Sequence, residues 1–413
     1  MAEPTEAGVR IEIRSWLAEH WDPERPLLEW RALLADAGWA RPSWPVDWFG
    51  RGLPAWADQV VADEIAAAGA VGAPVGSGMW LAAPTLLEHG SDELKRRVLR
   101  PTVTGEVTWC QLFSEPGAGS DLAGLTTRAE RDSDEWVVNG QKLWSTSAHH
   151  ADYGMLLART DWDAPKHRGI TYFVLPMSQP GVEPRPLRQM NGHASFNEVF
   201  LTDARVPDAN IVGRAGDGWK VALTTLAHER GFGGLRRPVF AAATGRVVRE
   251  AMQEAEAFFA TYRWYPQRAG RPDLAVPLAR DTGRSGDAVA RQEIAALVAF
   301  QRAQEWTARR AQAARARGRP PGPEGSAGKL GASRVARASA AVHSLLAGAD
   351  AMLCGPDSLM GGVVAEVLVS VPAQSIAGGT DEVQRNIIGE RVLGLPKEPA
   401  PEADLPFRET RHG

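Results

Sequence analysis

Two stretches decide the fold of this chain: Ser-Glu-Pro-Gly-Ala-Gly-Ser-Asp at residues 114–121 and Asn-Gly-Gln-Lys-Leu-Trp-Ser-Thr at residues 139–146. The glycines of the first let the backbone curl, so that successive N–H groups can face an anion or a carbonyl. In the second, Asn139-Gly140 predicts a hairpin turn, because both residues tolerate positive φ. Trp144 can stack on a flat ring, and the same segment supplies hydroxyls for hydrogen bonds. Taken singly, the first motif is equally well a turn between elements, and the second is better explained as a hairpin with a core tryptophan.

Short strand-like runs surround these motifs. Residues 154–158, 170–175 and 198–201 are apolar and β-prone, and Pro and Gly separate them at short intervals. This pattern predicts a compact antiparallel β domain over residues 107–214.

The chain before this domain, residues 1–106, has a helical pattern. Ile13 and Leu17 recur at helical spacing, and residues 55–69 are rich in alanine without internal Pro or Gly. Ser91 is a candidate N-cap of a further helix that we expect to end before Pro101.

The chain after the β domain, residues 215–398, is again helical. Residues 238–262, 287–317 and 326–353 carry apolar residues at helical spacing and are joined by short links. Long helices with short links predict an antiparallel bundle. The remaining residues 399–413 are rich in Pro and charge, and we expect a disordered tail.

Composition limits the function classes. The chain has 413 residues, 44% hydrophobic and 23% charged, with a formal net charge of -4, which argues against nucleic acid as a partner. No run of about 18 uncharged apolar residues is apparent, so we expect no membrane span. The only cysteines are Cys110 and Cys354, which indicates two reduced thiols and no metal site. With an acidic N-terminus that lacks an apolar region, the expected location is cytoplasmic.

Two further motifs lie in the C-terminal half. Residues 377–385 read Ala-Gly-Gly-Thr-Asp-Glu-Val-Gln-Arg, in which Thr380 is a candidate N-cap. Residues 228–231 read His-Glu-Arg-Gly and close a helix that we expect to begin near Trp219. Singly, these are a capping loop and a surface ion pair.

Together, the four motifs make the chain resemble the acyl-CoA dehydrogenase family, over nearly its whole length up to Leu395. The resemblance implies an α+β fold with an N-terminal helical domain, a middle antiparallel β domain and a C-terminal four-helix bundle. It also implies FAD as cofactor, an acyl-CoA substrate, an electron-transfer flavoprotein as acceptor, a homotetramer or heterotetramer, and a role in lipid metabolism such as fatty acid β-oxidation.

The resemblance also carries residue roles. The residues implied to bind FAD are Gln111, Leu112, Phe113, Ser114, Gly119, Ser120, Trp144, Thr146, Thr380 and Glu382. Those implied to bind substrate are Ser120, Arg230 and Gly378. The family's R-x-x-F-G segment, whose Arg reaches FAD in a neighbouring subunit, is missing, and Arg280 or Arg284 is a candidate substitute.

The position of the catalytic base is predicted from a difference between this chain and many members of the family. The reaction needs a carboxylate to remove the α proton, hydrogen bonds to polarise the thioester carbonyl, and a flavin to accept the β hydride from the opposite face. Many relatives carry the base where this chain has Gly378; a minority carry it in a Glu-Arg pair, which here is Glu229-Arg230. We therefore expect Glu229 to be the base, with the Gly378 N–H at the thioester carbonyl. Asp381 or Glu382 is the alternative acceptor.

Other functions stay open at this point. Glu229 could be a structural ion-pair partner in a non-catalytic subunit of a mixed oligomer. A flavin enzyme of the same fold could instead act on a carrier-protein-bound substrate. Gly231, Gly233 and Gly234 after Glu229 could make room for a bulky acyl group or only loosen the helix.

Overall fold

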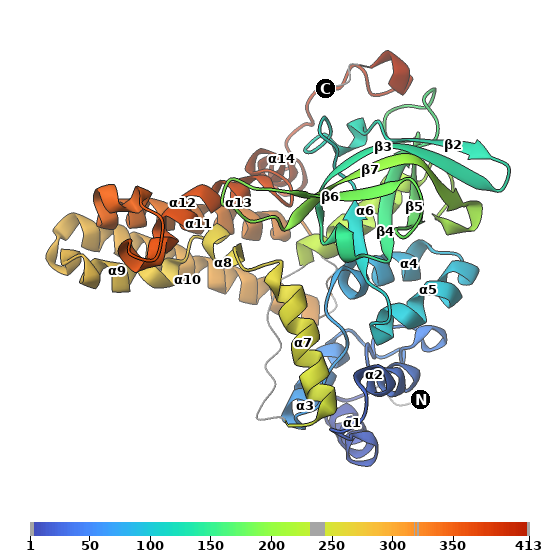
Figure 1. Cartoon of the computed structure of the whole chain (residues 1–413), viewed down its shortest axis with the longest axis horizontal. Helices are drawn as coiled ribbons and strands as arrows, with labels where there is room; N and C mark the ends of the chain where they lie inside the picture. The colour runs from blue at the N-terminus through green and yellow to red at the C-terminus, as the bar shows by residue number, and fades with distance from the viewer. Residues whose placement is uncertain (1–3, 232–243, 318, 320–321, 411–413) are drawn as a thin grey trace. The chain divides into compact units, whose positions relative to one another are not determined.

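The computed structural model describes residues 4–231, 244–317, 319 and 322–410, and for residues 230, 231, 315, 316 and 324 it describes the backbone alone. Its residues form two compact units (Figure 1). The first contains the described residues up to Leu187, residues 194–261 and those from 400 onward. The second contains residues 188–193 and 262–399.

The first unit begins with helices α1 (Glu6–His20), α2 (Leu27–Asp36) and α3 (Trp56–Ala67). A fourth helix, α7 (Arg246–Ala260), packs with them through Val247, Val248 and Ala251. Glu254 of α7 also pairs with the buried Arg31 at 2.6 Å. Helix α7 therefore belongs with the N-terminal helices and not with the C-terminal bundle in which residues 215–398 were expected. The expected residues 238–243 of this helix lie outside the described chain.

Helices α4 (Ala83–His89) and α5 (Asp92–Thr104) follow a π-helical turn over Gly78–Ala82. The predicted cap is confirmed, because the Ser91 hydroxyl accepts a hydrogen bond from the Leu94 N–H at 3.2 Å. The expected end before Pro101 is wrong, since Pro101 lies inside α5. Burial of Val98, Leu99, Thr102 and Val103 on one face keeps the helix going past the proline.

The middle of the chain forms one eight-stranded sheet. Its strands are β1 (Trp109–Leu112), β2 (Arg128–Asp132), β3 (Glu135–Thr146), β4 (Tyr153–Arg159), β5 (Ile170–Pro176), β6 (Val182–Leu187), β7 (Phe196–Pro207) and β8 (Ile211–Val212). The order is β6-β7-β3-β2-β4-β5-β8, with β1 beside β4. The sheet is mixed and not purely antiparallel as expected, because β1 and β2 each pair with β4 in parallel.

The predicted hairpin at Asn139-Gly140 is wrong. Both residues lie within β3, where the pairing with β7 shifts register. Gly140 is needed there because a Cβ would lie 2.5 Å from the Thr127 Oγ1. The turn between β2 and β3 lies instead at Ser133, which has a φ of 61°. In the sequence, a glycine required by the close approach of a neighbouring strand looks the same as a glycine required by a hairpin turn.

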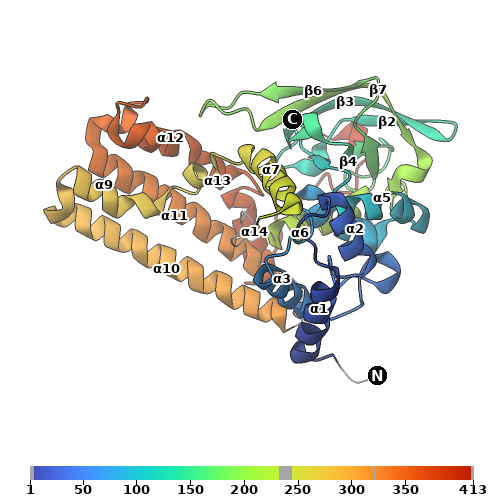
Figure 2. The same cartoon turned by 60° about the horizontal axis from the view of Figure 1, so that its bottom comes forward.

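Helix α6 (Gly218–Gly231) packs against β5, α4 and the π-helical turn, and begins where the sequence predicted. The second unit contains α8 (Tyr265–Arg268), α9 (Ala275–Asp281), α10 (Ala288–Ala316), α11 (Glu324–Ala347), α12 (Val363–Ser370), α13 (Pro372–Ile376) and α14 (Asp381–Arg391). The two long helices α10 and α11 run side by side (Figures 1 and 2). Helix α11 ends at Ala347 and not at the predicted end, Leu353, because the backbone of Gly348 is not helical.

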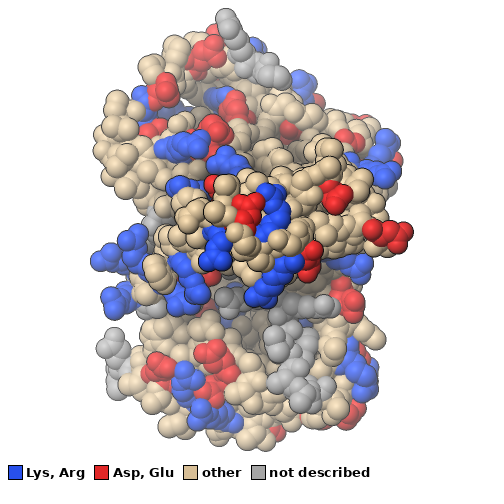
Figure 3. Space-filling model, turned by 90° about the vertical axis from the view of Figure 1, so that its left-hand side faces the viewer, with Lys and Arg blue, Asp and Glu red and all other residues tan. Residues whose placement is uncertain are grey.

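The stretch Leu359–Arg391 is long and apolar enough, by length and composition, to be a candidate membrane span. The structure divides it into three helices. Helix α12 ends at Ser370, α13 begins at Pro372, and Gly378-Gly379 separate α13 from α14. The longest of these three, α14, has 11 residues, fewer than the about 20 that a bilayer requires. On the face drawn in Figure 3, Lys and Arg side chains lie beside Asp and Glu.

The C-terminal segment differs from the expected disordered tail. Phe407 is fully buried in the first unit and opens a short 3₁₀ turn, Phe407–Glu409. Its N–H donates to the Ala164 carbonyl at 3.0 Å. One aromatic side chain with a binding site on the sheet is enough to order an otherwise polar segment.

Candidate active site

Strand β1 and helix α6 bring Gln111 and Glu229 together. In β1, Cys110 and Leu112 point into the sheet core and are fully buried, so that Gln111 points to the opposite face. The Gln111 Nε2 donates to the Glu229 Oε2 at 3.5 Å. The predicted base therefore lies beside the strand that leads into the predicted flavin loop.

A buried set of hydroxyl groups anchors α6 one turn before Glu229. The Thr225 hydroxyl lies 2.9 Å from the Thr85 hydroxyl of α4 and 3.2 Å from the Tyr172 hydroxyl of β5. All three side chains are fully buried, and burial raises the pKa of Tyr172. Since residues four apart share a helix face, the anchor fixes the face from which Glu229 projects. Glu229 itself is half-buried.

The predicted flavin loop, residues 114–121 and called the flavin loop below, is held at its start by a buried ion pair that the sequence analysis missed. Glu115 and Ala118 exchange two backbone hydrogen bonds of 3.1 Å, which closes a tight turn. The Glu115 carboxylate accepts from the Thr126 and Thr127 N–H groups and from the Lys142 ammonium, at 2.7, 2.9 and 2.8 Å. Lys142 also donates to the Phe113 carbonyl. The pair joins the loop to β3.

Electrostatics keep this pair charged. Burial acts to raise the pKa of Glu115, but the Lys142 charge and the hydrogen bonds hold it at about 2. Burial lowers the pKa of the fully buried Lys142, against the effect of Glu115. A signal was present in the sequence: Trp136, Val138 and Lys142 lie at even spacing on one face of β3, and a charged residue on an inward face needs a buried partner.

Trp144 is a surface residue and not the core tryptophan that was expected if residues 139–146 were only a hairpin. It lies at the second register shift between β3 and β7, has a φ of 62°, and its side chain is 53% exposed. Its ring contacts Phe196 edge-on at 5.5 Å. A bulky residue in left-handed geometry is rare and marks a constrained position. Thr146, two residues later, is half-buried. An exposed ring held this way fits a role in stacking on a ligand.

Gly119 and Ser120 are exposed on the loop, and a Cβ at Gly119 would meet nothing within 4 Å. Leu112 and Phe113 are buried in the core, so only their backbone groups are available to a ligand. Ser114 is half-buried, and its carbonyl accepts from the Leu143 N–H at 2.8 Å.

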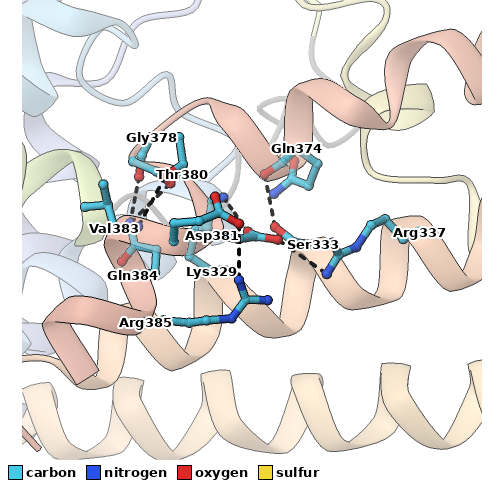
Figure 4. Close-up of polar contacts among 12 residues, drawn as sticks. Lys329, Ser333, Arg337, Gln374, Gly378, Thr380, Asp381, Val383, Gln384 and Arg385 are labelled. Carbon is cyan, nitrogen blue, oxygen red and sulfur yellow. Dashed lines mark hydrogen bonds and ion pairs between the residues drawn. The ribbon is translucent and has the colours of Figure 1, made fainter. Parts of the chain in front are cut away.

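The C-terminal motif lies in the second unit (Figure 4). Thr380 is confirmed as the N-cap of α14, because its hydroxyl accepts from the Val383 N–H at 3.2 Å. Gly378 and Gly379 have φ values of 69° and 81°. The Gln384 amide donates to the Gly378 carbonyl at 3.0 Å, which holds this glycine turn against the first turn of α14.

Asp381 is held in ion pairs. Its carboxylate is 2.9 Å from the Lys329 ammonium and 3.4 Å from the Arg337 guanidinium, and the residue is 1% exposed (Figure 4). Burial acts to raise its pKa, but Lys329 and Ser333 lower the pKa overall. Such an acid is a poor proton acceptor. Glu382 is exposed and pairs with Arg385 at 3.2 Å.

The two arginine candidates for a contact with FAD differ in their surroundings. Arg284 donates to the Leu345 carbonyl and pairs with Asp287 at 2.7 Å, so its guanidinium is already engaged within the second unit. Arg280 is exposed. The side chain of Arg230, and Gly233 and Gly234, lie outside the described part of the molecule.

Comparison with known proteins identifies the family. Residues 4–106, 110–204 and 272–393 match the N-terminal, middle and C-terminal domain models of acyl-CoA dehydrogenases. The chain belongs to the acyl-CoA dehydrogenase family, whose members are FAD-dependent oxidoreductases.

The relatives include acyl-CoA dehydrogenase IpdE1 of Mycobacterium tuberculosis, 34% identical over 94% of this chain and 97% of that protein. Acyl-CoA dehydrogenase FadE34 of the same organism is 39% identical over 95% of this chain. The chain spans about half of FadE34, 49% of its length.

Among solved structures, the ChsE4–ChsE5 complex of M. tuberculosis matches with a TM-score of 0.65 and 29% identity, over 96% of this chain and 99% of that one. The Tcur3481–Tcur3483 steroid acyl-CoA dehydrogenase matches with a TM-score of 0.65 and 25% identity, over the same shares.

Proposed function

We propose that this protein oxidises an acyl-CoA thioester between its α and β carbons, with FAD as cofactor and Glu229 as the base. The observation that carries the proposal is the contact between Glu229 and Gln111. It places a half-buried carboxylate beside the strand that enters the flavin loop, within one compact unit.

The residues present fit a flavin. Trp144 offers an exposed, constrained ring, Thr146 a hydroxyl on the same strand end, and Gly119-Ser120 exposed backbone on a glycine-rich loop. In the second unit, Thr380 and Glu382 would meet the pyrophosphate region, as the family resemblance implies. Bound FAD supplies the hydride acceptor.

The chain's own residues supply proton chemistry and orientation. Glu229 takes the α proton, and the Gln111 amide orients its carboxylate by donating one hydrogen bond. The Thr85–Thr225–Tyr172 anchor holds α6 in place while this happens. The Gly378 N–H, which needs no side chain, polarises the thioester carbonyl. The two ion pairs of Asp381 argue against this residue as the base.

For the substrate, we propose a bulky acyl group carrying rings, because one structural relative is named a steroid acyl-CoA dehydrogenase. An electron-transfer flavoprotein is the proposed acceptor and the cytoplasm the proposed location, in keeping with the two free cysteines. The fatty acid chain that the sequence suggested is the competing substrate.

Anaerobic mixing with a panel of acyl-CoAs tests the function. The purified protein should be yellow, and a steroid-type acyl-CoA should bleach the flavin faster than straight-chain acyl-CoAs of C4 to C16. Protein that stays colourless after incubation with FAD would reject the flavin assignment. Equal or faster bleaching by straight chains would reject only the ring-bearing substrate.

A second candidate is a subunit of a heterotetramer. Two structural relatives are named as two-component assemblies, and the base position of common relatives is Gly378 here. This chain would then supply one class of subunit, and a homotetramer is the alternative. Co-expression with a second, similar chain encoded nearby tests it: a gain of bound FAD or activity supports the heteromer, and full activity of the chain alone rejects it.

A further inference from the structure

The C-terminal segment Pro406–Thr410 is bound along residues 162–165 of the first unit. The Phe407 N–H donates to the Ala164 carbonyl at 3.0 Å, and the Arg408 N–H donates to the Trp162 carbonyl at 3.1 Å. A β-bridge links Pro406 to Pro165. The Thr410 hydroxyl closes the turn on the Phe407 carbonyl at 2.8 Å. The segment therefore has a specific binding site on the connection between β4 and β5.

Phe407 lies on a buried cation in that site. The Arg159 guanidinium is 3.3 Å from the centroid of the Phe407 ring, and the Trp162 ring is 5.4 Å from the same centroid. Both Arg159 and Phe407 are fully buried. A cation held over an aromatic face away from water gains more than an exposed one. Burial lowers the pKa of Arg159 to about 10, so its side chain remains charged at neutral pH.

Arg159 in turn holds the end of the flavin loop. Its guanidinium donates to the Ala123 carbonyl at 2.7 Å and to the Leu125 carbonyl at 3.2 Å, directly after the loop's last residue, Asp121. It also donates to the carbonyl of Lys166, whose ammonium pairs with Asp121. The loop is thus clamped at its start by Glu115–Lys142 and at its end by Arg159.

We propose that the C-terminal segment is an internal ligand of the connection between β4 and β5, and that Phe407 is a positioning residue that sets the flavin loop through Arg159. This inference rests on the proposed flavin site. It predicts that binding of the segment and binding of FAD are coupled, and such coupling is reciprocal.

The experiment uses full-length Phe407→Ala, with Leu405→Ala as the matched control. Leu405 is an apolar residue directly before this segment, but it is 40% exposed. Coupling energies in proteins typically change affinity by about 5–150-fold, and we expect the FAD dissociation constant of Phe407→Ala to rise about tenfold. Leu405→Ala should bind FAD like the wild type. Affinities are measured below the unfolding transition, with circular dichroism as the check on folding.

A synthetic peptide of residues 400–413 separates positioning from a general loss of stability. Added to Phe407→Ala, it should restore FAD affinity, and FAD should tighten peptide binding by the same factor. Phe407→Leu keeps an apolar side chain without a ring face, and should give an intermediate FAD affinity if Phe407→Ala does not fold.

Unchanged FAD affinity in folded Phe407→Ala, or peptide binding that FAD does not affect, would overturn the inference. A wild-type protein that binds no FAD would instead reject the proposed flavin function, so the two failures are distinguishable.

Discussion

Glu229 and Asp381 are the two acids that the sequence offered as proton acceptors, and their surroundings differ. Asp381 is buried beside two cations, Lys329 and Arg337, in the first turn of α14. Glu229 is half-buried, and a neutral amide, that of Gln111, contacts its carboxylate. An acid neutralised by two cations holds a fold together, whereas a general base must take up a proton near the working pH. The two ion pairs of Asp381 argue against it as the base, and Glu229 is the acid that we propose for this role.

The largest expected effect is on the rate of flavin reduction. Glu229→Gln keeps the shape of the side chain but removes the proton acceptor, and general-base catalysis typically contributes about 10²–10⁴-fold. Stopped-flow bleaching by the best acyl-CoA should therefore slow by about that factor, with FAD content unchanged. Glu88→Gln is the control, because Glu88 is a mostly exposed acid that also contacts α6, at Thr224. Equal loss in both variants would contradict the assignment.

The next effect is on stability at the flavin loop. Glu115→Gln leaves the fully buried Lys142 ammonium without its charge partner, and breaking a buried ion pair costs about 3–5 kcal/mol. Chemical denaturation should show a loss of about 3 kcal/mol in the unfolding free energy of the first unit. Glu183→Gln, which breaks the exposed pair with Arg185, should leave the denaturation midpoint unchanged.

The unfolding free energy measured as a function of acid pH tests the role of Glu115. The pKa of Glu115 is about 2 in the folded protein and 4.5 for an ordinary glutamate, so the pair's stabilisation is complete above pH 4.5 and is lost as the pH falls from 4.5 toward 2. Glu115→Gln should lack this part of the acid-induced loss. A variant whose stability falls as steeply as that of the wild type over this range would contradict the proposed clamp.

Asp381→Asn should act on stability and not on the chemical step. Removing the charge leaves Lys329 and Arg337 facing a neutral amide, and we expect a loss of about 2 kcal/mol in the unfolding of the second unit. The rate of flavin bleaching at saturating substrate and FAD should stay within a factor of about three of the wild type. A loss of about 10²-fold or more in this rate, in protein that keeps its FAD, would move the base to Asp381.

The smallest effect is expected at Gln111. Gln111→Leu removes the amide that donates to the Glu229 carboxylate, so flavin reduction should slow about tenfold. Gln59→Leu on α3 is the matched control, since Gln59 donates to Asp63 at 2.8 Å on an exposed surface. Flavin reduction at the wild-type rate in Gln111→Leu would contradict a role of Gln111 in orienting Glu229.

The comparison also separates what the sequence could predict from what it could not. Local signals held where one residue decides the geometry, as with the N-caps Ser91 and Thr380. The strands at 154–158 and 170–175 were found because burial on both faces leaves a continuous apolar run, and the strand at 198–201 because buried Val199 and Leu201 alternate with half-buried residues.

The sequence-based predictions were wrong where residues far away in the sequence determine the local structure. Asn139-Gly140 lies inside β3 at a register shift and not in a turn, because β7 pairs across it. Helix α7 and Phe407 pack against residues more than 200 positions away, which no local pattern can show. Of the candidate site, Glu229 and Trp144 were found by motif, whereas the buried pair of Glu115 with Lys142 and the cation Arg159 needed the three-dimensional structure.

The most direct test of Glu229 as the base follows the proton alone. An acyl-CoA with sulfur in place of the β methylene can lose its α proton but cannot transfer a β hydride. Exchange of its α hydrogens with D₂O, measured by NMR on the wild type, Glu229→Gln and Asp381→Asn, therefore isolates the first step. We predict that Glu229→Gln slows the exchange by about 10²-fold or more, while Asp381→Asn exchanges like the wild type. Exchange at the wild-type rate in Glu229→Gln would contradict the assignment.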